Sequence, residues 1–185
     1  MAEIETIEMP DATTQPQAYR EALLAVIGDR DPLEVMAATP GRVRALVQGR
    51  DPDQLERPAA DGAWSARNVI GHLVDVDIVY GFRWRLALTA DRPRYPGYDE
   101  KLWSRLPGPP AARLCELLEG LREHNLLLLR SLSPAQWSRV AVHEEQGEEA
   151  VELMVRKVAG HDLAHLDQLR RTIAAVRASS TTPTP

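Results

Sequence analysis

Residues 160–169, GHDLAHLDQL, place two histidines, His161 and His165, one helical turn apart. On an α-helix, side chains four residues apart lie on one face and can share a single metal ion. Apolar residues recur around the pair at spacings of three or four, which turns this face toward a core: Met154, Val158 and Leu169. Because a buried imidazole without a partner is costly, metal ligation would explain the pair. The stretch predicts a long core helix that carries two metal ligands.

A third histidine, His72, lies in a second long helical pattern, WSARNVIGHLVDVDIVYGFRWRLAL, at residues 64–88. Val69, Val76, Val79 and Arg83 share its face at helical spacing. A single histidine on an apolar face is ordinarily a hydrogen-bonded core residue. Three inward-facing histidines on two helices of one bundle instead favour a metal site. We therefore expect His72 to complete a set of three ligands with the histidines of the first pattern.

The motif HDLAH differs from the helix of a metalloprotease, although its two histidines have the same spacing. That chemistry needs Glu directly after the first histidine to act as a general base, and this chain has the shorter Asp162. We interpret Asp162 as a solvated surface charge, with a contact to an imidazole N–H as the alternative.

Composition limits the class of protein. The 185 residues suit one domain with a sizeable core, and its apolar runs, such as residues 126–129, are far shorter than the roughly twenty residues of a membrane-spanning helix. Because the first residues, MAEIETIEMPDATTQP, are acidic rather than a signal sequence, a cytoplasmic location is expected. A net charge of −5 argues against nucleic acid as a partner. Cys115 is the single cysteine, which precludes an internal disulfide and predicts a buried structural thiol.

The periodicity is helical throughout, with no convincing strand alternation. Thr39 and Pro40 are interpreted as an N-cap and a first-turn proline within an interrupted helix, and Ser65 as the N-cap of the His72 helix. A bundle domain is expected over residues 17–176, with disordered tails at 1–16 and 177–185. The expected helices cover residues 17–28, 31–49, 65–90, 110–132 and 149–176.

About nineteen residues, DRPRYPGYDEKLWSRLPGP, separate the His72 helix from the next one. An antiparallel hairpin needs only a few, so this segment can run the length of the bundle and make the two helices parallel. Long ordered loops are often functional, which makes Tyr98, Asp99 and Trp103 candidates for the mouth of a pocket. The alternative is a structural crossover whose aromatic residues pack on the bundle.

Four further polar residues have possible roles near the histidines. Arg83 lies eleven residues after His72, three turns along the same face, and could hold an anionic group of a substrate. Asp75, one turn from His72, could orient its imidazole or act as a base, or could be a solvated helix residue. His143, in the segment HEEQG, is interpreted as a loop histidine near the site rather than a ligand, and His124 as a residue on a polar helix face.

Four segments together resemble the DinB/YfiT-like superfamily, in its metal-dependent hydrolase branch: GAWSARNVIGHLVDVD at 62–77, PGYDEKLW at 96–103, SPAQW at 133–137 and HEEQGEEAVELMVRKVAGHDLAHLDQL at 143–169. The resemblance covers residues 31–175. It implies an all-α four-helix bundle of up-down-down-up type with a long crossover loop, often dimeric, with one divalent metal ion on His72, His161 and His165. Many relatives have Glu where this chain has Asn68, which is expected to weaken the capping box.

Characterised members of the superfamily include transferases and isomerases that use mycothiol or bacillithiol. Three functions follow as hypotheses: a transferase that joins a low-molecular-weight thiol to small electrophiles, a metal-dependent hydrolase, and a non-catalytic metal-binding stress protein. Three imidazoles suit several ions, with zinc or nickel favoured and iron, manganese or copper left open. The long helices carry apolar residues beyond the one narrow stripe that a core needs, such as Leu86 and Leu88, and we therefore expect a homodimer.

Overall fold

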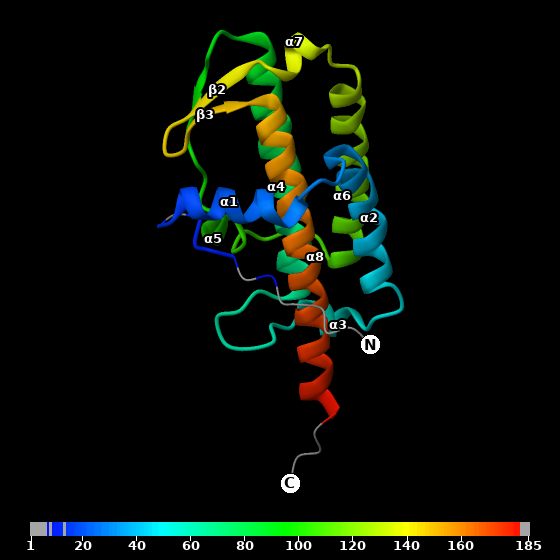
Figure 1. Ribbon diagram of the computed structural model, residues 1–185. Helices are drawn as coiled ribbons and strands as arrows, with labels where there is room; N and C mark the ends of the chain where they lie inside the picture. Colours follow the sequence, from blue (N-terminus) through cyan, green and yellow to red (C-terminus); the bar gives the residue numbers. More distant parts are fainter. Residues whose placement is uncertain (1–6, 8, 13, 182–185) are drawn as a thin grey trace.

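The computed structural model describes residue 7, residues 9–12 and residues 14–181, and within them four long helices form a bundle (Figure 1). These helices are α2 (Pro32–Val47), α4 (Ala66–Thr89), α6 (Ala111–Arg130) and α8 (Val151–Thr181). In Figure 1, α2 and α8 run downward, whereas α4 and α6 both run upward. The segment between α4 and α6 returns along the bundle, as its length predicted. The up-down-down-up topology expected from the sequence is confirmed.

The shorter elements surround this bundle. A first helix, α1 (Pro16–Ile27), crosses α8, and three single-turn or short helices lie in the connections: α3 (Pro52–Glu56), α5 (Glu100–Trp103) and α7 (Pro134–Trp137). The crossing is close, because a Cβ added at Gly160 would meet the carbonyl oxygen of Leu23 at 2.1 Å. Only glycine fits there, directly before His161.

A small sheet corrects the expectation of an entirely helical chain. It contains β1 (Arg94–Tyr95), β2 (Val140–His143) and β3 (Gly147–Ala150), with β1 parallel and β3 antiparallel to β2. Strands of two to four residues are too short for an alternating pattern to stand out in the sequence. Gly147, at a φ of +80°, begins β3 directly after the tight turn at residues 144–146. The register places His143 beside Tyr95 of the crossover segment.

The N-terminus of α4 is better capped than expected. The backbone N–H of Asn68 donates to Ser65 Oγ, and Asn68 Oδ1 accepts from the backbone N–H of Ser65, both at 3.2 Å. Asn68 therefore closes the capping box that it was expected to weaken. Its Nδ2 also donates to the carbonyl of Ser104 at 3.0 Å, which joins the cap to the crossover segment.

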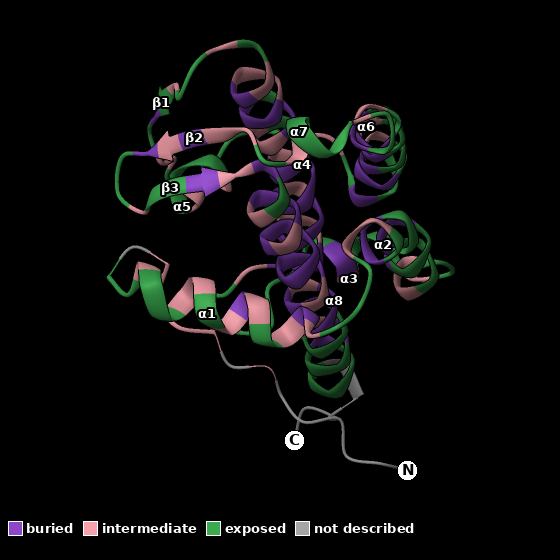
Figure 2. Ribbon diagram, turned by 45° about the horizontal axis from the view of Figure 1, so that its top comes forward, coloured by how far each residue is buried: buried purple, intermediate pink, exposed green. Residues whose placement is uncertain are grey.

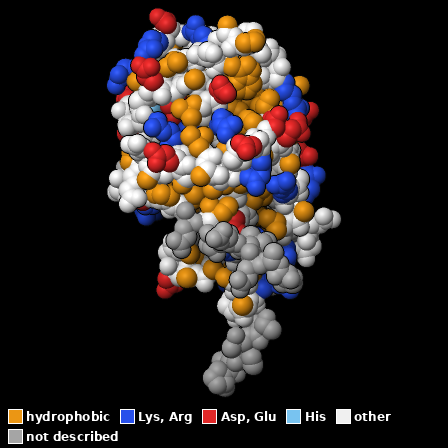
Figure 3. Space-filling view, in the orientation of Figure 1, with side chains coloured by type: hydrophobic (Ala, Val, Ile, Leu, Met, Phe, Trp, Pro, Cys, Tyr) orange, Lys and Arg blue, Asp and Glu red, His pale blue; other side chains and the backbone are white. Residues whose placement is uncertain are grey.

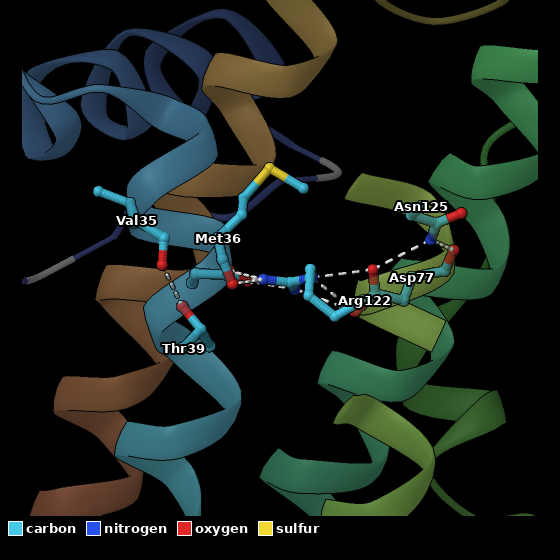
Figure 4. A network of polar contacts seen from close by, with 7 residues as sticks. Val35, Met36, Thr39, Asp77, Arg122 and Asn125 are labelled. Atoms are coloured by element: carbon cyan, nitrogen blue, oxygen red, sulfur yellow. Dashed lines mark hydrogen bonds and ion pairs between the residues drawn. The ribbon is translucent and has the colours of Figure 1, made fainter. Parts of the chain in front are cut away.

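Helix α2 is continuous and contains Pro40, contrary to the predicted interruption. Asp31 is its N-cap and accepts the N–H groups of Leu33 and Glu34, whereas Thr39 lies inside the helix. Proline lacks the N–H that would bond to the carbonyl of Met36. Arg122 of α6 donates to that carbonyl instead, at 2.7 Å (Figure 4). The tertiary contact replaces the missing helical hydrogen bond.

Buried residues are concentrated where the long helices face one another (Figure 2). One apolar cluster surrounds Met154 and Val158, and a second surrounds Leu166 and Leu169, so His161 and His165 lie between them along α8. Cys115 is buried in the second cluster, as expected. On the face seen in Figure 3, acidic and basic side chains are intermixed.

The helix boundaries differ from the expected ones mainly at the C-terminus, where α8 continues to Thr181, five residues beyond position 176. The predicted disorder of residues 1–6, 8, 13 and 182–185 concerns positions outside the described residues. None of the helices in the described part of the chain is both long and apolar enough to cross a membrane.

Candidate metal centre

Three histidines meet in the interior, His72 from α4 and His161 and His165 from α8. The Nε2 atoms of His72 and His161 lie 2.9 Å apart, and one nitrogen from each of the three rings lies within 4.8 Å of the other two. The ring centroids of His161 and His165 are 4.1 Å apart. The structure thus brings together the three residues that the sequence pattern selected.

Neighbouring groups orient the rings. Nδ1 of His165 lies 2.6 Å from Oε1 of Gln168, an acceptor, so Nδ1 carries the proton and Nε2 keeps a free lone pair. The indole of Trp64 covers the cluster, with ring centroids 5.0 Å from His72 and 6.3 Å from His165. Nδ1 of His161 is buried and has no hydrogen-bond partner among the described residues.

Electrostatics favour the uncharged form of each ring. Burial, followed by the like charge of a neighbouring histidine, lowers the pKa of His72 and His161 well below its usual value. Burial lowers the pKa of His165 to about 4. Neutral imidazole is the form that binds metal, and two Nε2 lone pairs 2.9 Å apart repel unless a proton or a cation lies between them. The three histidines fit a divalent ion.

Glu100 is a residue that the sequence analysis missed. It begins α5, whose N-cap Asp99 accepts the backbone N–H of Leu102 at 2.9 Å. Its Oε2 lies 3.6 Å from Nε2 of His72, and burial raises the pKa of its carboxyl group. Helical spacing does not relate Glu100 to His72, because the two residues lie on different elements. The only sequence signal for Glu100 is its position in the long connection, next to Asp99.

The histidine cluster adjoins a cavity of about 580 Å³. His161 forms part of its wall, beside Glu100 and Val158. Four residues singled out from the sequence also line this cavity: Arg83, Tyr98, Asp99 and His143. The crossover segment therefore contributes to a pocket, and does not only connect two helices.

Two other candidates lie apart from the cavity wall. Trp103 packs on Tyr98, with ring centroids 4.8 Å apart, and is 36% exposed. Asp75 is partly exposed on α4, and burial raises the pKa of its carboxyl group. Within the described residues no hydrogen bond or ion pair joins Asp75 to His72. His124 is exposed on α6, as expected, with Nε2 2.6 Å from Arg85 Nη2.

Asp162 is fully buried, which corrects its interpretation as a solvated charge. Its carboxylate forms an ion pair with Arg122, with Oδ2 at 2.5 Å from Nη1 and Oδ1 at 3.2 Å from Nη2. The Nε of the same guanidinium donates to both carboxylate oxygens of Asp77 at 3.0 Å (Figure 4). Burial raises the pKa of Asp162, and the charge of Arg122 opposes this shift. Asp162 thus anchors the helix turn that carries His161.

A second buried ion pair lies beside the cavity, whose lining includes Lys157 and Gln146. Nζ of Lys157, one turn before His161, contacts Oε1 of Glu149 and donates to Oε1 of Gln146 at 2.7 Å. The hydroxyl of Tyr95 donates to the other carboxylate oxygen of Glu149 at 2.5 Å. These bonds fix β1 and β3 against α8.

The chain is similar in sequence and in fold to known proteins. The model of the DinB superfamily matches residues 36–169. The protein named "Putative metal-dependent hydrolase YfiT" from Bacillus subtilis is 32% identical over 148 residues, which cover 75% of this chain and 82% of that protein. A similarly named protein, OB0413 from Oceanobacillus iheyensis, is 28% identical over 131 residues, or 70% of this chain and 76% of its own length.

A solved structure of YfiT from Bacillus subtilis, described as having an unusual four-helix bundle topology, superposes with a TM-score of 0.69 at 25% identity. The superposition covers 92% of this chain and 95% of that structure. With the family match over most of the chain, the chain belongs to the DinB superfamily.

Proposed function

We propose that His72, His161 and His165 bind one divalent ion, zinc or nickel, and that the protein is a metal-dependent enzyme that joins a low-molecular-weight thiol to a small electrophile. The observation that carries this proposal is the opening of the histidine cluster, through His161, onto a cavity of about 580 Å³. Sites for small molecules commonly have volumes of about 300–1,000 Å³. A bound thiol and its partner therefore have room beside the ligands.

The histidines supply a particular kind of site. Three neutral imidazoles leave the charge of a divalent ion intact and leave at least one coordination position for another molecule. An ion held there would favour the thiolate form of a thiol near neutral pH. The chain's own part is to keep the three rings uncharged through burial, to fix their orientation through Gln168 and Trp64, and to exclude bulk water around His72.

A hydrolase is the second candidate, and Glu100 favours it. A carboxylate 3.6 Å from His72 Nε2 is near enough to accept a proton from a water molecule beside the histidines. The names of the relatives point the same way. A hydrolase needs no thiol, whereas a transferase needs no general base once its thiol is ionised.

The experiment uses zinc-loaded protein with two probes, 1-chloro-2,4-dinitrobenzene and p-nitrophenyl acetate, each with bacillithiol, with mycothiol and without thiol. The transferase predicts thiol-dependent consumption of the chloroarene that is lost in His161→Ala and retained in Glu100→Gln. The hydrolase predicts ester cleavage without thiol that falls at least about 100-fold in Glu100→Gln, the size expected for a general base. Glu123→Gln, an exposed change on α6, is the matched control. Bound zinc without either reaction would overturn both and leave a metal-binding stress protein.

A further inference from the structure

Arg83 is a buried cation on the cavity wall without a carboxylate partner among the described residues. Only 4% of the residue is exposed. Its Nη2 donates to the carbonyl of Pro96 at 3.0 Å, and its Cζ lies 5.0 Å from the ring centroid of Tyr80 and 4.5 Å from that of Tyr95. A guanidinium has five N–H donors, and this single hydrogen bond uses one of them. The other donors have no partner among the described residues, and the side chain lines the cavity.

The other deeply buried cations of the described chain have their charges matched. Arg122 is bound by Asp77 and Asp162, and Lys157 is bound by Glu149. Burial of an unpaired charge is costly, which is why buried cations in proteins are normally paired. Two aromatic rings stabilise Arg83 partly through cation–π contact, but they satisfy no N–H group. Arg83 therefore lacks the anion that the other two possess.

His143 adds a second donor at the same place. Its Nδ1 accepts the backbone N–H of Glu145 at 3.1 Å, so the neutral ring carries its proton on Nε2. Burial, and then the charge of Arg83, lower the pKa of His143, which keeps the ring neutral. Its centroid lies 5.2 Å from the ring of Tyr95, the ring that Arg83 also covers. The β1–β2 pairing thus brings the ring of His143 to the same tyrosine that the guanidinium covers, and both side chains line the cavity.

We propose that Arg83 and His143 form a subsite for a carboxylate group of the molecule that occupies the cavity. A singly charged carboxylate suits these walls better than a phosphate, because the lining contains Asp99, Glu100 and Glu145 as well as Lys101 and Lys157, and the acidic groups repel a dianion more strongly. The inference rests on the proposed function only in placing the carboxylate and the metal ligands in one cavity. Its test is arranged so that the subsite can be judged without metal.

The position of Arg83 also sets the shape of the ligand. Eleven residues of helix separate it from His72, which corresponds to an axial rise of roughly 16 Å. Helical side chains lean toward the N-terminus, so the guanidinium lies nearer the histidines than its Cα does. An acetate-sized anion cannot contact both ends. The ligand is an extended molecule, with the reacting group near His161 and the carboxylate several bonds away.

The experiment compares probes that differ only at one end. Metal-free protein is titrated with hexanoate and with 1-hexanol, and chemical shifts are followed by NMR. Cobalt-loaded protein is titrated with 6-mercaptohexanoate and with 6-mercaptohexanol, and the thiolate-to-cobalt absorption band reports thiol binding. Variants are Arg83→Met, Arg83→Lys and, as a matched control on the same helix, Arg85→Met, which changes an arginine outside the cavity lining.

The subsite predicts that metal-free wild type binds hexanoate about 10–100-fold more tightly than hexanol, the range expected for charged hydrogen bonds. Arg83→Met abolishes this preference, Arg83→Lys retains part of it, and Arg85→Met leaves it unchanged. Equal binding of acid and alcohol by the wild type overturns the proposal, whatever the variants do and whether or not the protein binds cobalt. With cobalt, a preference for 6-mercaptohexanoate assigns the carboxylate to the thiol substrate. If hexanoate binds more tightly than 1-hexanol but the two thiols bind cobalt-loaded protein equally, the carboxylate belongs to the electrophile.

Discussion

Nη1 of Arg122 lies 2.7 Å from the carbonyl oxygen of Met36, the carbonyl that Pro40 leaves without a helical donor. The same guanidinium binds Asp77 of α4 and Asp162 of α8, so one side chain of α6 contacts the other three long helices. Asn125, one turn further along α6, donates to the carbonyl of Asp77 at 2.9 Å. This buried network holds α8 in register at the residue next to His161.

Removal of Arg122 should therefore destabilise the whole bundle. Arg122→Met leaves two buried carboxylates without their partner, and the loss of one member of a buried ion pair typically costs about 3–5 kcal/mol. Urea unfolding followed by circular dichroism measures the change in free energy. Arg113→Met, on the exposed face of the same helix where the arginine forms a surface ion pair with Glu116, should change stability by at most about 0.5 kcal/mol. Similar losses of unfolding free energy in both variants would show that the buried network contributes no more to stability than a surface ion pair.

Pro40 and Arg122 should be energetically coupled. In Pro40→Ala the new N–H can bond to the carbonyl of Met36, so the contribution of Arg122 to that carbonyl becomes partly redundant. The cost of Arg122→Met should then be smaller in the Pro40→Ala background by about 1 kcal/mol, the net value of one hydrogen bond. A double-mutant cycle on urea midpoints measures this coupling. Additive effects would mean that Arg122 acts on its carboxylates alone.

Features repeated along one helix could be predicted from the sequence. The spacing of His161 and His165, and the stripe that includes His72, identified the cluster because all three positions follow from helical periodicity. The parallel arrangement of α4 and α6 could also be predicted, because the number of residues between them shows that the connection can span the length of the bundle. Both expectations concern properties of a single segment.

Features that depend on contacts between distant segments were missed. Asp162 looked solvated because its partner Arg122 lies forty residues earlier, in LREHN, a run that reads as polar although Arg122 and Asn125 are buried. Glu100 approaches His72 from the single-turn helix α5 in the long connection, which is too short for a periodic pattern to fix a direction. Periodicity assigns faces to helices, but it does not say which buried polar group a face will meet.

The metal-free protein should lose stability as the pH falls below about 6.5, the usual pKa of histidine. The pKa values of His72, His161 and His165 are lowered in the folded state, so the unfolded chain binds protons first. The loss continues toward pH 4, where His165 itself titrates. Glu100 and Asp162, with raised pKa values, contribute the opposite slope, so the measurement compares wild type with His165→Gln. Thermal midpoints between pH 7.5 and 5 should fall less steeply in the variant. If the thermal midpoints of wild type and variant fell in parallel, the lowered pKa of His165 would be contradicted.

We propose that the chain forms a homodimer through the outer face of α4. Leu86 and Leu88, which suggested pairing, pack in part against the core, whereas Ile78 and Phe82 are 49% and 61% exposed one turn apart. Light scattering should report a mass about twice the 20.6 kDa of the chain. Phe82→Asp should yield a monomer, and Thr89→Asp, at the exposed end of the same helix, should not. A monomeric wild type at tens of micromolar excludes the dimer.

The histidine cluster should bind one divalent ion per chain. His72→Ala and His165→Ala each remove a ligand and should abolish tight zinc binding, although these residues lie on different helices. Asp162→Ala should act differently, because it breaks the ion pair with Arg122 and lowers folding stability by about 3–5 kcal/mol while changing metal affinity at most about 100-fold. Calorimetry with metal-free protein at pH 7.5, with elemental analysis of bound zinc as a second measurement and His124→Ala as the control, separates these effects. Equal zinc occupancy in wild type and His72→Ala would make His72 a core histidine.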